Sequence, residues 1–282
     1  MRVLILGAGG MLGHDLSRTA PNGTELLPLT KHDLNITDTA SLATHVSDKK
    51  PDVILNVAAY TAVDRAETES ELCYRVNAVA VGELGRIAAK AGARVVHLST
   101  DYVFNGKASQ PYGEDSPTDP VNTYGASKLA GEQALEKSGA DWLVVRTQWL
   151  FGVHGKSFPR TMWERARAGL ETRVVKDQTG RPTHSYDLAV TIWELIPRGA
   201  RGLLHITNAG QATWFDLAMH VFSRAGRPDL LMACSTADFP TPARRPRYSV
   251  LDTTRLEKQL GRGLPAWPQA VDRFLEHLPD RG

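Results

Sequence analysis

The sequence is short of cysteine, of excess charge and of long apolar runs, and each shortage argues against a class of protein. Its two cysteines, Cys73 and Cys234, offer neither a disulfide framework nor metal-ligand spacing, which favours reduced thiols in a cytoplasmic protein. The formal net charge is only +2, so we expect no nucleic-acid partner. The apolar run at residues 3–6 is too short for a signal segment or a membrane span, so we expect no membrane partner.

Short apolar runs and helical stretches alternate through the first half of the chain. The runs are nearly continuous, which is typical of parallel strands covered on both faces; they lie at 2–6, 24–29, 52–57, 94–99 and 142–147. Helix candidates lie near 11–20, 38–49, 68–91 and 122–138. The alternation predicts an α/β fold with a Rossmann-like doubly wound parallel sheet, whose ligands bind at the carboxyl ends of the strands.

After about residue 150 the alternation weakens. We expect a further strand at 203–207, helices near 185–196, 213–225 and 267–278, and a loop rich in proline and arginine at 238–249. The pattern predicts an NAD(P)-binding Rossmann domain over 1–150 and a smaller, discontinuous α/β substrate-binding domain over 151–282. Part of the second half, around 185–210, is expected to return to the Rossmann domain.

Glycine is concentrated in the segment GAGGMLG, directly after the first apolar run. Gly7, Gly10 and Gly13 fit a GxxGxxG pattern, whereas the familiar GxGxxG fails because Leu12 stands where its last glycine would be. Glycine permits unusual turn dihedrals, backbone access to a pyrophosphate and close packing of a helix on a sheet. The pattern predicts a dinucleotide site, and the alternative is a glycine-rich turn that binds no nucleotide.

The end of the second expected strand bears on the choice of dinucleotide. The segment LTKHD places Lys31 ahead of Asp33. A basic residue there suits the 2′-phosphate of NADP, and an acidic residue suits the ribose or adenine. We therefore expect NADPH in preference to NADH, with a simply solvated Lys31 as the alternative. Two small residues ending the third strand, Ala58 and Ala59, would let the cofactor lie against the backbone.

A phenol and an ammonium lie four residues apart in the segment NTYGASKLAGE. The helical repeat makes Tyr124 and Lys128 neighbours on one helix face. A cation beside a phenol favours the phenolate and brings its pKa closer to neutrality, as acid–base catalysis requires. Alone the pair is a weak signal, but Thr100 at the carboxyl end of the fourth strand could orient a substrate carbonyl. Together the three residues predict a catalytic group for carbonyl reduction.

These motifs resemble those of the extended short-chain dehydrogenases/reductases, and most closely the dTDP-4-dehydrorhamnose reductase family. The similarity extends over nearly the whole chain, including the segments GGMLG, NVAAYTAVDRAE, VVHLSTDYVFNG, NTYGASKLAGE, RTQWLFG, KDQTGRPT and PTPARRPRYSVLDT. It implies that the 4-keto group of dTDP-4-dehydro-6-deoxy-L-mannose is reduced to dTDP-L-rhamnose by NADPH or NADH, in nucleotide-sugar and cell-surface polysaccharide synthesis. The implied partner is the dTDP-sugar, and the chain would act as a monomer or homodimer.

The resemblance implies a role for each matching residue. Tyr124 would donate the proton, Lys128 would hold the nicotinamide ribose, and Thr100 would bind the sugar near the reacting carbon. The substrate would also contact Asp101 and Trp149, with Arg244 and Arg245 offering guanidinium groups to the diphosphate. The cofactor site is expected to comprise Gly7, Gly9, Gly10, Met11, Leu12, Gly13, Lys31, Asp33, Leu34, Ala58, Ala59, Tyr60, Leu98, Tyr124 and Lys128.

Several of these positions have a structural alternative. Trp149 is one of six tryptophans, and a buried core aromatic is its plainer interpretation. The arginines at 244, 245 and 247 equally suit a rigid, solvated surface loop. Some relatives bind magnesium through acidic residues at a dimer interface. Asp15 matches one such ligand, but Tyr186 stands where another acid is expected, so we expect no metal.

Other functions remain open on this fold. The 4,6-dehydratases carry Thr-Asp-Glu where this chain has Tyr102 as the third residue, which argues for simple reduction. Another nucleotide-sugar 4-reductase, or a 4-epimerase that retains NAD tightly through its cycle, is an alternative. A reductase-like, non-enzymatic regulatory subunit of methionine adenosyltransferase is a second one, from a different class.

Overall fold

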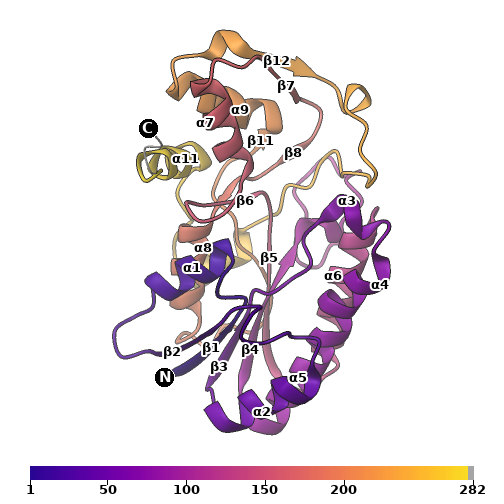
Figure 1. Cartoon of the computed structure of the whole chain (residues 1–282), viewed down its shortest axis with the longest axis vertical. Helices are drawn as coiled ribbons and strands as arrows, with labels where there is room; N and C mark the ends of the chain where they lie inside the picture. Colours follow the sequence, from indigo (N-terminus) through magenta and orange to yellow (C-terminus); the bar gives the residue numbers. More distant parts are fainter. Residues whose placement is uncertain (279–282) are drawn as a thin grey trace.

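A six-stranded parallel sheet organises the larger part of the molecule, in a computed structural model that describes residues 1–278 (Figure 1). The strand order β10-β5-β4-β3-β1-β2 is that of a doubly wound sheet, as the sequence predicted. β2 lies at one edge, where Pro28 removes no ladder bond from the interior. The strands are β1 (Arg2–Leu6), β2 (Glu25–Leu29), β3 (Val53–Asn56), β4 (Arg94–Thr100), β5 (Asp141–Thr147) and β10 (Gly202–His205).

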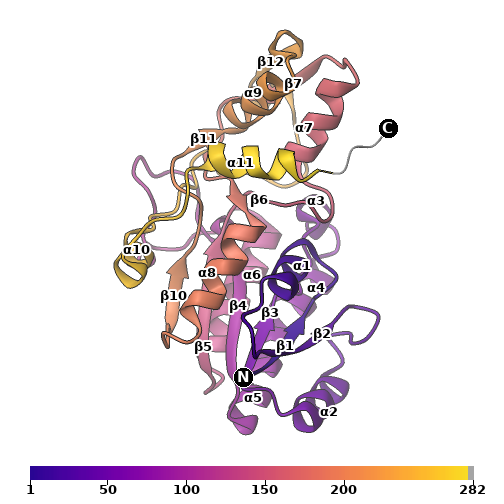
Figure 2. The ribbon, with the colours of Figure 1, turned by 90° about the vertical axis from the view of Figure 1, so that its left-hand side faces the viewer.

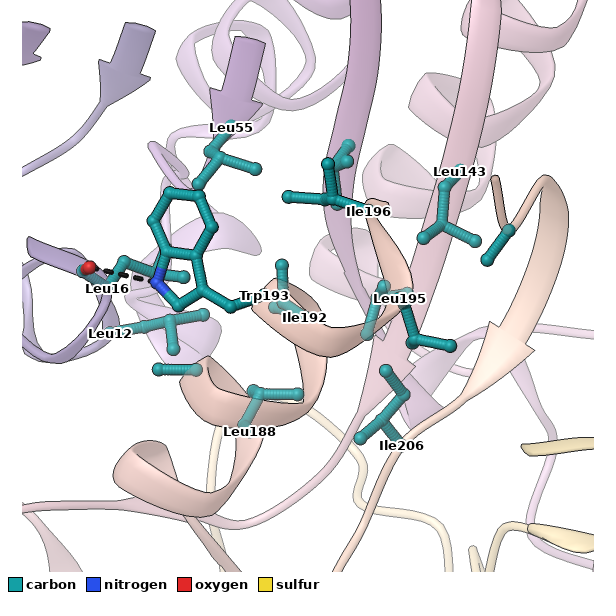
Figure 3. Close-up of a cluster of buried hydrophobic side chains, with 14 of the residues drawn as sticks. Leu12, Leu16, Leu55, Leu143, Leu188, Ile192, Trp193, Leu195, Ile196 and Ile206 are labelled. Atoms are coloured by element: carbon teal, nitrogen blue, oxygen red, sulfur yellow. Dashed lines mark hydrogen bonds between the residues drawn. The ribbon is translucent and has the colours of Figure 1, made fainter. Parts of the chain in front are cut away.

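Helices cover both faces of this sheet. On one face α1 (Met11–Arg18), α8 (Ser185–Leu195) and α10 (Thr254–Leu260) bury their leucines and isoleucines against the strands. The indole of Trp193 lies in this cluster and donates to the carbonyl of Leu16 at 3.0 Å, which ties α8 to α1 (Figure 3). On the other face lie α2 (Thr39–Lys49), α5 (Ala80–Ala91) and α6 (Thr123–Glu136). Burial of the strands on both faces explains their continuous apolar runs.

The helix expected over 68–91 is interrupted. Its first part is α4 (Ser70–Tyr74), which is preceded by the short helix α3 (Val63–Ala66), and a π-helical turn (Arg75–Val79) separates α4 from α5. Such a turn inserts an extra residue and redirects the side chains beside it. Here it presses the carbonyl of Asn77 against α6, where a Cβ on Gly131 would lie 2.0 Å from that oxygen.

The smaller part of the molecule lies at the other end of the long axis (Figure 1). Its core packs α7 (Phe158–Arg167), α9 (Trp214–Arg224) and α11 (Trp267–Glu276) around a parallel pair of strands, β7 (Thr172–Val175) and β12 (Leu231–Cys234). Two further pairs, β6 (Leu150–Phe151) with β9 (Thr183–His184) and β8 (Thr179–Gly180) with β11 (Ala212–Thr213), lie in the connecting segments.

Sequence patterns predicted α8, α9 and α11 but missed α7, α10, β7 and β12. The two strands are only four residues long; β7 contains the exposed Arg173 and β12 exposes Met232 and Ala233 between buried ends, so neither is buried along its length. The chain from α8 to β10 packs on the six-stranded sheet although it follows β6 to β9 in sequence. Figure 2 shows α8 in front of this sheet and α10 beside β10 at its outer edge.

Candidate active site

The glycine turn between β1 and α1 is packed so tightly that two of its positions exclude a side chain. Gly7 has φ +87°, and a Cβ there would lie 2.7 Å from the backbone nitrogen of Ala58. A Cβ on Gly13 would lie 2.5 Å from the carbonyl oxygen of Gly7. Gly9 has ordinary space around it, so sterics alone do not require glycine there. Gly10 caps α1 without a side-chain bond, which leaves the first N–H groups of the helix to an anion.

The loop after β2 lies beside this turn. The carboxylate of Asp33 accepts from both the backbone N–H and the hydroxyl of Thr30, at 2.8 and 2.7 Å, and these bonds hold the pKa of Asp33 below its usual value. Lys31 is exposed next to it. Leu12 and Leu34 bury their side chains in the two sheet cores, so only their backbone can face a cofactor.

The segment after β3 is fixed by a residue that sequence reasoning missed. The side-chain amide of Asn77, in the π-helical turn, accepts from the N–H of Tyr60 at 2.9 Å and donates to its carbonyl at 3.0 Å. The phenol of Tyr60 donates to Glu69 at 2.7 Å. These bonds set the strand end that carries Ala58 and Ala59 beside the glycine turn. An asparagine between the apolar residues Val76 and Ala78 was the available signal.

Tyr124 begins α6, and its surroundings keep the phenol protonated. Asn122 caps the helix by accepting from the N–H of Gly125 at 2.8 Å. A Cβ on Gly125 would lie 2.1 Å from the carbonyl oxygen of Tyr102, so only glycine lets α6 approach this closely. Burial raises the pKa of Tyr124 above its ordinary value, and a hydrogen bond with Thr100 opposes that rise. The expectation that Lys128 brings the pKa of Tyr124 closer to neutrality is therefore wrong for this structure, because burial dominates and keeps the phenol protonated, facing Thr100.

Lys128 lies one helical turn further along α6 and is buried. Its ammonium donates to the carbonyl of Leu98 at 2.6 Å and lies 3.3 Å from Nε2 of His97. Burial lowers the pKa of Lys128 to about 8, and the charge of Glu132 one turn further along α6 opposes the change. Lys128 thus keeps most of its charge at neutral pH, although its nearest contacts are on β4.

Asp101 follows Thr100 at the end of β4 and is buried. Burial raises the pKa of its carboxyl to about 7, while bonds from Ser249 and Thr100 pull in the other direction. Thr100 Oγ1 lies 3.1 Å from one carboxyl oxygen, and the other has no hydrogen-bond partner within residues 1–278. A buried carboxyl oxygen without a partner at a strand end is suited to a substrate hydroxyl.

Trp149 adopts a backbone conformation that few side chains tolerate. Its φ is +47°, and its indole stacks on Trp214 with ring centroids 3.6 Å apart and 10° between the planes. A Cβ on Gly180 would lie 2.6 Å from the same indole. The tryptophan is thus held between β8 and α9, and its left-handed backbone is the kind of strain that gathers at functional sites.

The two arginines predicted to meet a diphosphate differ. Arg245 makes a bidentate bridge to Asp64 on α3, with N–O distances of 2.6 and 2.9 Å. Arg244 is exposed, and its carbonyl accepts from Asn122 at 2.8 Å. Arg245 also lines a cavity of 610 Å³ that includes Tyr102, Trp214 and the exposed Phe239, together with Phe158, Met162, Arg165, Thr172, Arg173, Val174, Val175, Gln178 and Thr241. That volume and mixture suit a small organic anion.

The magnesium ligand suggested by the resemblance is engaged inside the protein. Asp15 is buried, accepts from the hydroxyl of Ser185 and pairs with Arg18 at 2.6 Å. The guanidinium of Arg18 lies over the ring of Tyr186, 4.8 Å from its centroid. Residues 1–278 contain no group of three side chains placed to hold a metal ion. Within the same range, no helix is both long and apolar enough to cross a membrane.

A doubly wound sheet whose strand-end threonine faces a tyrosine, with a lysine one helical turn further on, is the arrangement of the short-chain dehydrogenases/reductases. Comparison with known proteins narrows the class. Residues 1–279 match the family model described as the RmlD substrate binding domain. The chain belongs to the dTDP-4-dehydrorhamnose reductase family.

Relatives and solved structures match over almost the full length. The dTDP-4-dehydrorhamnose reductase of Burkholderia thailandensis is 40% identical, covering 99% of both chains. A probable dTDP-4,6-dihydroxy-2-methyloxan-3-one 4-ketoreductase of Streptomyces antibioticus is 44% identical, covering 99% of this chain and 95% of the other. The structure of dTDP-4-dehydrorhamnose reductase from Bacillus anthracis, in complex with NADP, superposes with a TM-score of 0.94 at 36% identity, covering 98% of both chains.

Proposed function

We propose that this protein reduces the 4-keto group of dTDP-4-dehydro-6-deoxy-L-mannose to dTDP-L-rhamnose with NADPH, in the synthesis of nucleotide sugars and cell-surface polysaccharide. The observation that carries the proposal is the group of Thr100, Tyr124 and Lys128 at the carboxyl edge of the sheet, in a chain of this family; Thr100 and Lys128 are buried and Tyr124 is half-buried. The cavity lined by Arg245 supplies space and positive charge for the dTDP part.

The proposed cofactor fits the chain's own geometry. The turn that excludes side chains at Gly7 and Gly13 would let a pyrophosphate reach the N-terminus of α1, and Lys31 would meet a 2′-phosphate. Exposed Lys31 favours NADPH over NADH. We assign cofactor binding to the Rossmann half, 1–150 with the return around 185–210. The remainder of 151–282 would be the substrate-binding half.

In the proposed reaction Tyr124 is the acid and Thr100 orients the carbonyl. NADPH, when bound, supplies the hydride. As the sugar C4 carbon accepts the hydride, the electrons of the C=O π bond move to oxygen, which takes the proton of the Tyr124 hydroxyl. The raised pKa of Tyr124 keeps that proton in place until then. The positive charge of Lys128 would stabilise the tyrosinate left behind, and Asp101 and Trp149 would hold the sugar.

The oligomeric state and the cellular location are proposed from the composition of the chain. We propose a cytoplasmic enzyme that acts as a monomer or homodimer, because its two cysteines and balanced charge are typical of such proteins. Asp15 is already bound by Ser185 and Arg18, which supports a reaction without magnesium at that position.

The test supplies the purified protein with the keto sugar nucleotide and follows NADPH and NADH oxidation separately. We expect sugar-dependent oxidation, faster with NADPH, and a fall in kcat of about 100-fold or more in Tyr124→Phe. The exposed Tyr74 on α4 offers a matched control, Tyr74→Phe, which should keep the wild-type rate. No product, or an undiminished rate in Tyr124→Phe, would refute the mechanism.

The resemblance to the 4-ketoreductase of Streptomyces antibioticus supports a second candidate, reduction of another 4-keto dTDP-sugar. Parallel assays with dTDP-4-dehydro-6-deoxy-D-glucose separate the two by their kcat/KM. A tightly retained NAD in the purified protein, with interconversion of two sugars and no net oxidation of NADPH, would instead indicate a 4-epimerase. A lack of turnover together with binding to methionine adenosyltransferase would indicate the regulatory subunit.

A further inference from the structure

His97 is a buried imidazole to which the proposed mechanism gives no task. It lies in β4, three residues before Thr100, and is fully enclosed. Its Nε2 is 3.3 Å from the ammonium nitrogen of Lys128, and its Nδ1 is 3.1 Å from the side-chain nitrogen of Asn56 on β3. Both of its ring nitrogens therefore face polar groups.

The ring is neutral in this environment. Burial lowers the pKa of His97 well below its ordinary value, and the charge of Lys128 lowers it further. A neutral imidazole carries one N–H and one lone pair, so the two nitrogens have opposite roles. Which role falls to Nε2 decides whether the ring attracts or repels the ammonium.

The neighbours of the ring favour the tautomer with the proton on Nδ1. If Nε2 carried the proton, its N–H would point at the N–H groups of Lys128. A hydrogen bond with the backbone of Asn56 opposes the fall in the pKa of His97. A bond that favours the protonated ring indicates that an acceptor on β3 faces the ring. The side-chain oxygen of Asn56 is buried without a partner within residues 1–278. A half-turn of that amide exchanges its oxygen and nitrogen in the same space and places the oxygen against Nδ1.

We propose that His97 is a positioning residue for the reduction. Asn56 holds its Nδ1–H tautomer, and its Nε2 lone pair binds the Lys128 ammonium and fixes it one helical turn from Tyr124. Of the three N–H donors of that ammonium, the carbonyl of Leu98 takes one and His97 a second. The third remains for the nicotinamide ribose. The proposal rests on the proposed function in one respect, that the charge of Lys128 serves the reduction by Tyr124.

Other charges around Lys128 do not replace this contact. Glu132 on the same helix is occupied by a bidentate bridge to Arg146 on β5. The thiol of Cys73 on α4 is bonded to Ser127, and burial raises the pKa of that thiol, so it remains neutral. Tyr124 is likewise protonated, because burial raises its pKa. The imidazole is therefore the only neutral nitrogen acceptor that contacts the ammonium among the hydrogen bonds of residues 1–278.

A direct test reads the tautomer and needs neither sugar nor cofactor. The full-length protein is labelled with ¹⁵N-histidine, and long-range ¹H–¹⁵N spectra are recorded at pH 7, with His97 assigned by its loss in His97→Gln. We expect the Nδ1–H tautomer, with Nε2 at the shift of a hydrogen-bonded acceptor. A proton on Nε2, or a doubly protonated ring, would overturn the proposal.

A second test follows the Lys128 charge through NADPH binding between pH 6 and 10, measured by fluorescence, and through the pH profile of kcat. His97→Phe keeps the ring but removes the acceptor, so the alkaline limb of both profiles should move about one pH unit toward acid. At pH 8 NADPH affinity should fall about fivefold, because the charged fraction of Lys128 falls by about that factor. His97→Gln restores an acceptor and should recover most of both effects.

The matched control is His205→Phe, because His205 is an equally buried histidine of the same sheet, on β10, whose Nδ1 faces the carbonyl of Asp252. It should leave both profiles in place whatever its stability. The proposal would be contradicted if the alkaline limbs of His97→Phe stayed at their wild-type positions. It would also be contradicted if His97→Gln lost as much NADPH affinity as His97→Phe. NADPH binding without sugar turnover would count against the proposed function alone, since the tautomer and binding readouts need no substrate.

Discussion

Two arginine–carboxylate bridges of nearly the same geometry stand in different parts of the proposed site. Arg146 on β5 binds Glu132 on α6 through bonds of 3.0 and 2.6 Å, and Arg245 binds Asp64 on α3 through bonds of 2.6 and 2.9 Å. The side chains of the first pair are 4% and 9% exposed, whereas those of the second are 18% and 42% exposed. The two pairs therefore differ in their access to water more than in their bonding.

The difference indicates that an arginine–carboxylate pair supports the fold in one place and prepares a ligand site in the other. Neither member of the buried pair can be rehydrated in place, so removing one partner leaves an uncompensated charge between the sheet and α6. That pair supports the helix that carries Tyr124 and Lys128. The more accessible pair also binds the backbone of Ala243, and it holds a guanidinium in the lining of the cavity, where we propose that a diphosphate takes the place of Asp64.

The largest effect is expected from breaking the buried bridge. Glu132→Gln leaves the guanidinium of Arg146 without a counter-charge and replaces the carboxyl oxygen that accepts from its Nη2 with an NH2 donor. We expect the free energy of unfolding to fall by about 3–5 kcal/mol, measured by urea denaturation followed by circular dichroism. Glu136→Gln is the control, since Glu136 is exposed one turn further along α6. Equal stability of the two variants would show that the bridge does not support the helix.

The sequence predicted the Rossmann part well because its signals are local. Continuous apolar runs located the strands, and the helix expected near 122–138 is α6, which Asn122 caps. The proposed catalytic residues could be named because a tyrosine and a lysine four apart share a helix face. The turn chemistry of Gly7 and Gly13 is likewise contained in seven residues.

What could not be predicted depends on contacts between distant segments. The bridge from Asp64 to Arg245 joins residues 181 apart in sequence, and no local pattern links them. The task of His97 appears only when β3, β4 and α6 meet. The π-helical turn at Asn77 interrupts an amphipathic pattern that otherwise reads as one helix. Short elements such as β7 and β12 owe their stability to tertiary packing, which overrides weak propensity.

A smaller effect on stability should come from Asp101, a second buried charge near the bridge of Glu132. Its pKa is about 7 in the folded protein against 3.8 ordinarily, so between these values the folded state binds more protons than the unfolded state. Its contribution to stability is therefore present below about pH 4 and is lost as pH rises through 7. Asp101→Asn should remove that loss, at most about 4 kcal/mol between pH 4 and pH 8.

The measurement compares wild type and Asp101→Asn by denaturation across this pH range, because their difference isolates one carboxyl from the rest. Asp48→Asn, at an exposed position on α2, should follow the wild-type curve. Parallel curves for wild type and Asp101→Asn would mean that Asp101 stays ionised in the folded protein. The buried surroundings of Asp101 would then have to contain a counter-charge that keeps its carboxylate ionised.

The smallest effect on stability, and a clear one on binding, is expected from the exposed bridge. Arg245→Gln leaves Asp64 42% exposed to water, so the melting temperature should change little. The KM for the dTDP-sugar should rise about tenfold, because an amide cannot form the bidentate, charged contact with phosphate oxygens. Arg86→Gln, at an exposed position on α5, is the control and should leave KM unchanged. Equal KM values in the two variants would place the diphosphate elsewhere, and a large loss of stability in Arg245→Gln would make this bridge a structural support like that of Glu132.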